Sequence, residues 1–274
     1  MIQNKIDKQI VTKKVMAILN ITPNSFFPKS RKQTKQEIIK RIIQIKKERA
    51  DIIDIGGYSS HPNSEFVSEK EEINRVQLGL ELLFQEMPNA IVSIDTFRSK
   101  VVKECAKKFP ISIINDISAG KLDSKMTNII TELHVHYIIM HMRGTPQTAM
   151  KYTKYNDLLS EILSFFEEKI NYLYHRGIYD IWIDPGFGFS KTTYQNYKIL
   201  SQLKQFSIFN LPIVVGISRK TMIREIIKVS TEKALNGTTA LNMFALTQGA
   251  DIIRVHDVKE AVQTIKLYNQ IQTI

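Results

Sequence analysis

Eight short apolar runs recur along the chain, separated by longer stretches with helical spacing. The runs span residues 15–20, 51–55, 90–95, 111–116, 137–142, 181–184, 212–217 and 251–255. Runs so rich in Ile and Val are typical of parallel strands that are buried on both faces. Because strands and helices alternate, the pattern predicts an α/β fold, and we expect a single closed (β/α)8 TIM barrel.

The stretches between these runs carry the marks of amphipathic helices. Two apolar stripes at helical spacing are formed by Ile38, Ile39, Ile42 and Ile43 and by Val101, Val102, Cys105, Ala106 and Phe109. Thr34 with Glu37, and Ser68 with Glu71, have the spacing of capping boxes and predict two helix starts.

A doubly wound open sheet is the competing layout for such a pattern. That layout is less favoured, because no G-x-G-x-x-G motif follows the first apolar run. The chain has 274 residues and no linker, low-complexity segment or strong short-period repeat. We therefore expect one domain over residues 1–274, with residues 1–14 as an N-terminal extension.

The net charge of +11 arises from 38 basic and 27 acidic residues. The lysines are dispersed over predicted helices, as at Lys46-Lys47 and Lys107-Lys108, which favours a solvated outer surface over a nucleic-acid partner. No apolar run approaches the ~20 residues of a membrane span, and residues 1–14 lack the pattern of a secretory signal. The single cysteine, Cys105, is expected to be buried and inert, and a reducing cytoplasm is the expected location.

Polar residues stand at or just after the ends of most of the predicted strands. They are Asn20, Asp95, Asn115, Asp116, Asp184, Ser218, Arg219, Lys220, Arg254 and His256. Any one of them could be a helix cap or a satisfied core group. In a barrel, however, these strand ends all lie on the face where active sites form, so their coincidence predicts a site.

The chemistry of these residues is mutually compatible. Asp184 precedes a Gly- and Phe-rich turn, and its carboxylate suits a flat ring with adjacent N–H donors, such as a 2-amino-4-oxo pyrimidine. Lys220, Arg254 and His256 are donors for an oxo group or phosphate oxygens. Asn20 offers an oxygen that Mg²⁺ would accept beside a diphosphate.

At these residues the sequence resembles dihydropteroate synthases, from Val15 to about Leu267. The resemblance is carried by residues 16–23, 51–57, 93–96, 114–117, 140–142, 184–189, 216–220 and 253–258. It implies a cytoplasmic TIM-barrel transferase of folate biosynthesis. The implied reaction joins a dihydropterin diphosphate to 4-aminobenzoate with release of diphosphate.

The resemblance also implies a set of site residues and partners. Asp95, Asn115, Asp184 and Lys220 would hold the pterin, with Met140 against its ring. Asn20, Arg254 and His256 would face the diphosphate, with Mg²⁺ as cofactor at Asn20. Phe189, Ser218, Thr221, Ser60 and His61 would border 4-aminobenzoate, and Lys220, Arg254 and His256 are the catalytic candidates. Family members are commonly homodimers and sulfonamide targets, which we expect here by resemblance only.

Two loops depart from the family pattern. Asn24 replaces an aspartate of the family, Ser60 a threonine, and His61 an arginine. Because the exchanged Asp and Arg would lose opposite charges together, the sequence is compatible with a working enzyme. We expect altered handling of 4-aminobenzoate and altered sulfonamide sensitivity.

Three other functions compete with this interpretation. A pterin-dependent methyltransferase domain would share the pterin-binding groups but has no need for Lys220, Arg254 and His256 around a diphosphate. A non-catalytic pterin-binding relative would explain the altered loops. A basic nucleic-acid partner would show salt-sensitive binding, but no stacking motif supports it.

Overall fold

The computed structural model describes residues 13–21, 34–59 and 66–273 of the chain. Its strands are β1 (Lys14–Asn20), β2 (Ile52–Gly56), β3 (Val92–Asp95), β4 (Ile113–Asp116), β5 (His136–Met140), β6 (Ile181–Asp184), β7 (Val214–Val215) and β8 (Ile252–Val255). All eight overlap the predicted apolar runs, and their ends differ from the predicted ends by at most two residues.

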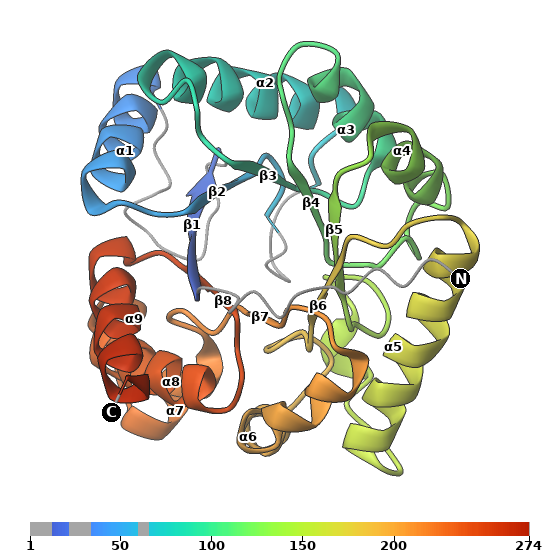
Figure 1. The fold of residues 1–274 in the computed structure, drawn as a ribbon, viewed down its shortest axis with the longest axis vertical. Coiled ribbons are helices and arrows are strands. Elements are labelled where there is room, and N and C mark those ends of the chain that lie inside the picture. The colour runs from blue at the N-terminus through green and yellow to red at the C-terminus, as the bar shows by residue number, and fades with distance from the viewer. Residues whose placement is uncertain (1–12, 22–33, 60–65, 274) are drawn as a thin grey trace.

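The strands form one parallel sheet in the order β6-β5-β4-β3-β2-β1-β8-β7. A parallel bridge between Ile183 and Ile213 joins β6 to the segment before β7 and closes the sheet into a barrel. The helices surround this barrel as an outer ring (Figure 1). The predicted (β/α)8 barrel is therefore confirmed.

The helices follow the strands in chain order. They are α1 (Lys35–Glu48), α2 (Glu69–Glu86), α3 (Ser99–Ala106), α4 (Met126–Leu133), α5 (Leu158–His175), α6 (Thr193–Ser201), α7 (Thr221–Ile227), α8 (Leu235–Thr247) and α9 (Val258–Gln272). Short 3-10 helices occur at η2 (Ala149–Lys151), η3 (Leu203–Phe209) and η4 (Thr231–Lys233). The β7–β8 connection carries both α7 and α8.

The two predicted capping boxes differ in outcome. Thr34 caps α1 with the full reciprocal pair to Glu37, as predicted. Ser68 caps α2 by accepting from the Glu71 amide, but the Glu71 side chain does not return to the cap. Instead it forms an ion pair with Arg75 at 2.7 Å, which competes for the same carboxylate.

The apolar stripe of α1 is narrower than predicted. Ile38, Ile42 and Ile45 are buried, whereas Ile43 is 47% exposed. Ile38, Ile42 and Ile45 are four and three residues apart and so lie on one face of a helix with 3.6 residues per turn. Ile43 lies off that face. On α3, Val101, Val102 and Cys105 are buried as predicted.

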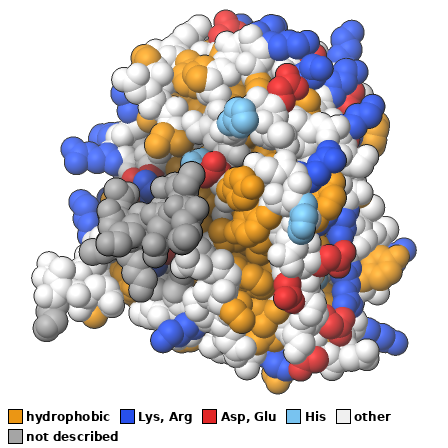
Figure 2. All heavy atoms as spheres, turned by 45° about the vertical axis from the view of Figure 1, so that its right-hand side comes forward, with side chains coloured by type: hydrophobic (Ala, Val, Ile, Leu, Met, Phe, Trp, Pro, Cys, Tyr) orange, Lys and Arg blue, Asp and Glu red, His pale blue; other side chains and the backbone are white. Residues whose placement is uncertain are grey.

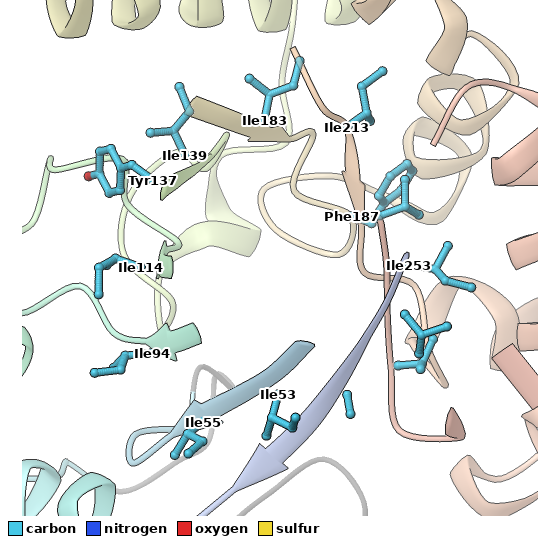
Figure 3. Close-up of a cluster of buried hydrophobic side chains, with 14 of the residues drawn as sticks. Ile53, Ile55, Ile94, Ile114, Tyr137, Ile139, Ile183, Phe187, Ile213 and Ile253 are labelled. Carbon is cyan, nitrogen blue, oxygen red and sulfur yellow. The ribbon is translucent and has the colours of Figure 1, made fainter. Parts of the chain in front are cut away.

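Alternate residues of each strand face two different cores. Outward side chains pack against the helices, and Figure 3 shows part of this outer core, including Ile53, Ile94 and Ile183. Inward side chains form a smaller apolar layer of Met16, Ile52, Ile113, Ile138, Val214 and Ile252, with Trp182 against it. This layer fills the barrel below the carboxyl ends of the strands, so that a site can form only above it.

The outer surface agrees with the predicted dispersal of charge. Lys46, Lys47, Lys107 and Lys108 are all exposed. On the face drawn in Figure 2, basic side chains are scattered among polar and acidic ones. Within the described residues, no helix has the length and apolar character needed to cross a membrane.

Candidate active site

A cavity of about 700 Å³ opens at the carboxyl ends of the strands. It brings together the described candidates from the sequence, namely Asn20, Asp95, Asn115, Met140, Asp184, Phe189, Ser218, Lys220, Thr221, Arg254 and His256. The remaining candidates, Ser60 and His61, and the exchanged Asn24 lie outside the described residues. The volume is in the range of small-ligand sites.

Arg254 lies between two carboxylates at the base of this cavity. Its Nε donates to Asp54 Oδ2 and its Nη2 to Asp95 Oδ2, both at 2.6 Å. Burial opposes its charge, but Asp54 and Asp95 more than offset this and raise the pKa of Arg254. The guanidinium is therefore held in one orientation and stays positive.

Asp54 belongs to this group although sequence reasoning did not single it out. It is fully buried on β2 and also accepts a hydrogen bond from Asn115 Nδ2 at 3.0 Å. This contact fixes the rotation of the Asn115 amide, because the NH₂ end must face Asp54. The signal was present in the sequence as one carboxylate inside an otherwise apolar strand, two residues before Gly56.

Asp184 and Lys220 approach the cavity from β6 and from the segment after β7. Asp184 Oδ1 accepts from the Gly186 amide at 2.7 Å, which orients the carboxylate. Lys220 Nζ donates to the Phe187 carbonyl and lies 5.0 Å from the centre of the Phe189 ring. The turn after β6 thus links an acceptor, a cation and an aromatic ring.

Burial sets the protonation behaviour of these groups. It raises the pKa values of Asp95 and Asp184, against the opposing effects of Arg254 on Asp95 and of Lys220 on Asp184. It lowers the pKa of Lys220 to about 8, while Asp184 opposes this change. Lys220 therefore loses its proton closer to neutral pH than an exposed lysine does.

His256 enters the cavity as a neutral donor or acceptor. Burial, with the nearby charge of Arg254, lowers the pKa of His256 to about 3. Its Nδ1 lies 3.1 Å from Ser218 Oγ, and its backbone carbonyl accepts from Arg41 Nη2 at 2.6 Å. His256 consequently adds no positive charge beside Arg254 and Lys220 in the cavity.

Two residues at the strand ends are structural. Asp116 points away from the barrel interior and accepts from the Ser118 and Gly120 amides and from the Tyr137 hydroxyl. Arg219 binds Asp257 through two hydrogen bonds of 2.8 Å, away from the neighbouring Lys220. For Asp116 this follows from alternation along β4, because the residue next to inward-facing Asn115 must face outward. Arg219 lies in the turn after β7 with a left-handed φ of 56°.

An apolar surface lines another part of the cavity. Met140, Ile117, Met142 and Ala149 form a cluster with Phe189 packed against it. Met140 and Asp184 are paired in register on β5 and β6, so the thioether lies next to the carboxylate. A flat heterocycle with polar edges matches such a combination of apolar and acceptor groups.

The residues available to a divalent metal are few. Among the described residues, no group of three or more His, Cys, Asp or Glu side chains could hold an ion. Asn20 Oδ1 lies close to Gly56 at the end of β1, and Asp95 Oδ2 lies close to the same glycine. Asp95 is bonded to Arg254, and Asn20 contributes an amide oxygen, a type of ligand that Mg²⁺ accepts.

Comparison with known proteins identifies the relatives of this chain. The family model of pterin-binding enzymes matches residues 16–256. The chain is 38% identical over 259 residues to a dihydropteroate synthase of Escherichia coli strain K12, covering 92% of this chain and 89% of that relative. It is 36% identical over 255 residues to the dihydropteroate synthase of Bacillus subtilis strain 168, covering 92% and 86%.

Solved structures agree with this sequence similarity. A sulfonamide complex of Yersinia pestis dihydropteroate synthase superposes with a TM-score of 0.91 at 33% identity, covering 96% of both chains. Xanthomonas albilineans dihydropteroate synthase with 4-aminobenzoic acid gives a TM-score of 0.87 at 30% identity, covering 96% and 94%. The chain belongs to the pterin-binding enzyme family, among its dihydropteroate synthases.

Proposed function

We propose that this protein condenses (7,8-dihydropterin-6-yl)methyl diphosphate with 4-aminobenzoate to give 7,8-dihydropteroate and diphosphate. The amine nitrogen forms a bond to the pterin methylene carbon while the bond from that carbon to the diphosphate oxygen breaks. The diphosphate leaves with the electron pair, and the new secondary amine loses a proton to solvent. This is a transferase step of folate biosynthesis.

The observation that carries this proposal is the charge layout of one cavity. Carboxylates from β3 and β6 and an amide from β4 lie at the base, and the cations Arg254 and Lys220 stand among them. The leaving diphosphate gathers negative charge as its bond breaks, which cations stabilise. A site that only bound a neutral pterin would not need two buried cations.

The pterin would be held by Asp95, Asn115 and Asp184, with Met140 against its ring. Because Asp54 occupies the Asn115 NH₂ group, the Asn115 carbonyl is the end left for a pterin N–H donor. Asp184, oriented by the Gly186 amide, would accept from adjacent ring N–H groups. Lys220 would donate to a ring oxo group.

The pterin methylene would face the part of the cavity where the diphosphate and 4-aminobenzoate bind. Arg254 keeps further N–H groups beyond its bonds to Asp54 and Asp95, and neutral His256 can donate through one ring nitrogen. Phe189, Ser218 and Thr221 would border 4-aminobenzoate. Its amine is neutral at pH 7 and needs no strong base, so catalysis rests on positioning and leaving-group stabilisation.

Mg²⁺ would bind at the Asn20 amide oxygen together with diphosphate oxygens and water. A hard cation bound through one protein oxygen and the substrate phosphates is usual for this metal. When bound, it would neutralise charge on the leaving group.

The reaction is tested by 4-aminobenzoate-dependent release of diphosphate from the dihydropterin diphosphate. Purified protein is assayed with and without Mg²⁺, and the organic product is identified by mass spectrometry. Release that needs both substrates and yields dihydropteroate supports the proposal. Pterin diphosphate binding without product overturns it in favour of a non-catalytic pterin-binding protein.

We also propose that the exchanged loop residues change the use of 4-aminobenzoate and of sulfonamides that compete with it. The double variant N24D/H61R restores the residue types usual in the family. It should change the KM for 4-aminobenzoate and the inhibition constant of a sulfonamide together. An unchanged KM would contradict this proposal.

A homodimer is proposed from the resemblance and from one apolar surface. Helices α6, α7 and α8 expose Tyr194 (77%), Ile226 (59%) and Phe244 (40%), and a shallow hollow between α6 and α8 includes Tyr194 and Phe244. Exposed apolar groups clustered on adjacent helices suit a self-complementary interface. Light scattering on F244E beside the unchanged protein tests this, because a dimer through this surface should dissociate.

A further inference from the structure

Lys191 is a buried lysine in the wall of the active-site cavity. Its side chain is only 1% exposed, although it is one of the larger side chains in the protein. It follows the turn after β6 and precedes α6. Burial of an amine is costly unless polar partners surround it, so its position calls for a physical reason.

Four neutral acceptors surround the Lys191 ammonium group. Nζ lies 3.0 Å from His141 Nδ1, and it donates to the carbonyls of Gly186, Phe189 and His141 at 3.0, 3.1 and 3.3 Å. Burial lowers the pKa of His141 to about 2, so its ring is neutral and Nδ1 can accept. Burial also lowers the pKa of Lys191 to about 7, against the opposing effect of Asp184.

The turn around this ammonium has an unusual backbone. Gly186, Gly188 and Ser190 have φ angles of 76°, 80° and 48°, in the left-handed region. Such a path turns successive carbonyls in different directions. The carbonyls of Gly186 and Phe189 point to Lys191, whereas that of Phe187 accepts from Lys220.

Two lysines therefore hold the same turn through different carbonyls. Both lysines border the cavity, Lys191 as a buried side chain and Lys220 as a half-buried one. The Phe189 ring lies under Lys220 Nζ, and the Gly188 α-carbon faces the Lys220 stem. A shift of the Phe189 carbonyl would move both the aromatic ring and the anchor of Lys220.

We propose that Lys191 is a positioning residue for the second substrate, an inference that rests on the proposed condensation. By fixing the carbonyls of Gly186 and Phe189, it holds the Phe189 ring in place at the 4-aminobenzoate site. Two of the pterin-binding residues, Asp95 and Asn115, stand on β3 and β4 outside this turn, and Asp184 is held by the Gly186 amide rather than by the carbonyls that Lys191 binds. Loss of Lys191 should consequently affect the two substrates unequally.

The test compares K191M with K204M. Methionine keeps much of the length of lysine but donates no hydrogen bond, and Lys204 is an exposed lysine of η3. In K191M the KM for 4-aminobenzoate should rise about tenfold or more, because small misplacements in a site are costly. The dissociation constant of the pterin diphosphate should change less than about threefold, and K204M should match the unchanged protein.

The outcomes separate this inference from the proposed function. An unchanged KM for 4-aminobenzoate, or equal weakening of both substrates, overturns the positioning role. If the unchanged protein makes no dihydropteroate, the proposed condensation fails, and direct binding of 4-aminobenzoate by equilibrium dialysis then decides the role of Lys191. Should K191M be insoluble, H141L removes one of the four acceptors and should raise the same KM in the same direction; an unchanged value overturns the inference.

Discussion

Arg254 is fixed in place before any substrate binds, and this decides what its guanidinium can do. Its bonds to Asp54 and Asp95 occupy Nε and Nη2, and its side chain is 18% exposed. Folding already orients the guanidinium, so the side chain needs little reorganisation when a leaving group gathers negative charge. Asp54 does not line the cavity, but it contacts two residues that do, Arg254 and Asn115.

The role of Asp54 leads to a prediction for D54N. The substitution keeps the shape of the side chain but removes the charge that anchors Arg254 and orients Asn115. We expect kcat/KM for the pterin diphosphate to fall on the order of 10²-fold, comparable to the loss of one donor to a developing anion. Steady-state kinetics measure this, with D180N at the 69% exposed Asp180 as the control. A fall of less than about threefold would show that Arg254 does not need Asp54.

Lys220 leads to a prediction about pH. Its ammonium form is the donor, and burial lowers its pKa to about 8, so kcat/KM should decline as pH rises through that value. Because burial raises the pKa of Asp95, activity should also decline on the acidic side sooner than for an exposed aspartate. In K220R the side chain stays charged, and the alkaline decline should disappear from the pH profile. A decline that persists in K220R would assign it to another group.

At the scale of elements, the turn between β6 and α6 matters most for the site. It carries Phe187 and Phe189, follows Asp184 and contacts Lys220. Gly186 passes so close to β5 that an added Cβ would lie 2.1 Å from the His141 carbonyl oxygen. The turn is therefore held by close backbone contact as well as by the two lysines.

Two glycines with the same φ angle allow the effect of backbone strain on stability to be measured apart from the effect of steric contact. Gly186 and Gly177 both have φ of 76°, but nothing lies within 4 Å of a Cβ added at Gly177. G177A should lower the free energy of unfolding by about 1 kcal/mol and leave activity unchanged. G186A should lower it by about 1 to 3 kcal/mol more, through overpacking, and should weaken pterin binding because the Asp184 turn moves. Thermal unfolding and calorimetry measure both effects, and equal losses in the two variants would contradict this account.

On the scale of the whole molecule, the barrel is closed between elements that are far apart in sequence. β1 pairs with both β2 and β8, and the Ile183–Ile213 bridge completes the ring. Because opening any strand pair exposes the shared core, we propose that the described residues unfold as one domain.

The chain contains two natural probes for this proposal. Cys105 is fully buried on α3, and burial raises its pKa to about 12, whereas Trp182 lies inside the barrel on β6. In urea, the reaction of Cys105 with a thiol reagent and the fluorescence of Trp182 should follow transitions with the same midpoint. Two separate midpoints would show that the barrel opens in parts.

The sequence by itself determined the barrel, its eight strands and the polar strand-end residues that meet in the cavity. Apolar runs and helical stripes are local patterns, and strand ends must gather on one face once the sheet closes. Alternation explains why Asp116 on β4 faces away from Asn115, whereas Arg219 lies in the turn after β7 and binds Asp257. A single sequence does not show the exact inward register, so this distinction was not available in advance.

Only the tertiary structure revealed how the site is held together. Asp54 and Arg254 are 200 positions apart, and Lys191 and His141 are 50 apart. No spacing rule connects such pairs, because their contact depends on the closure of the barrel and on the path of one turn. Burial likewise decided the neutral state of His256 and the low pKa of Lys220. Residue identity sets what a side chain can do, and its desolvation in the folded chain sets its charge at a given pH.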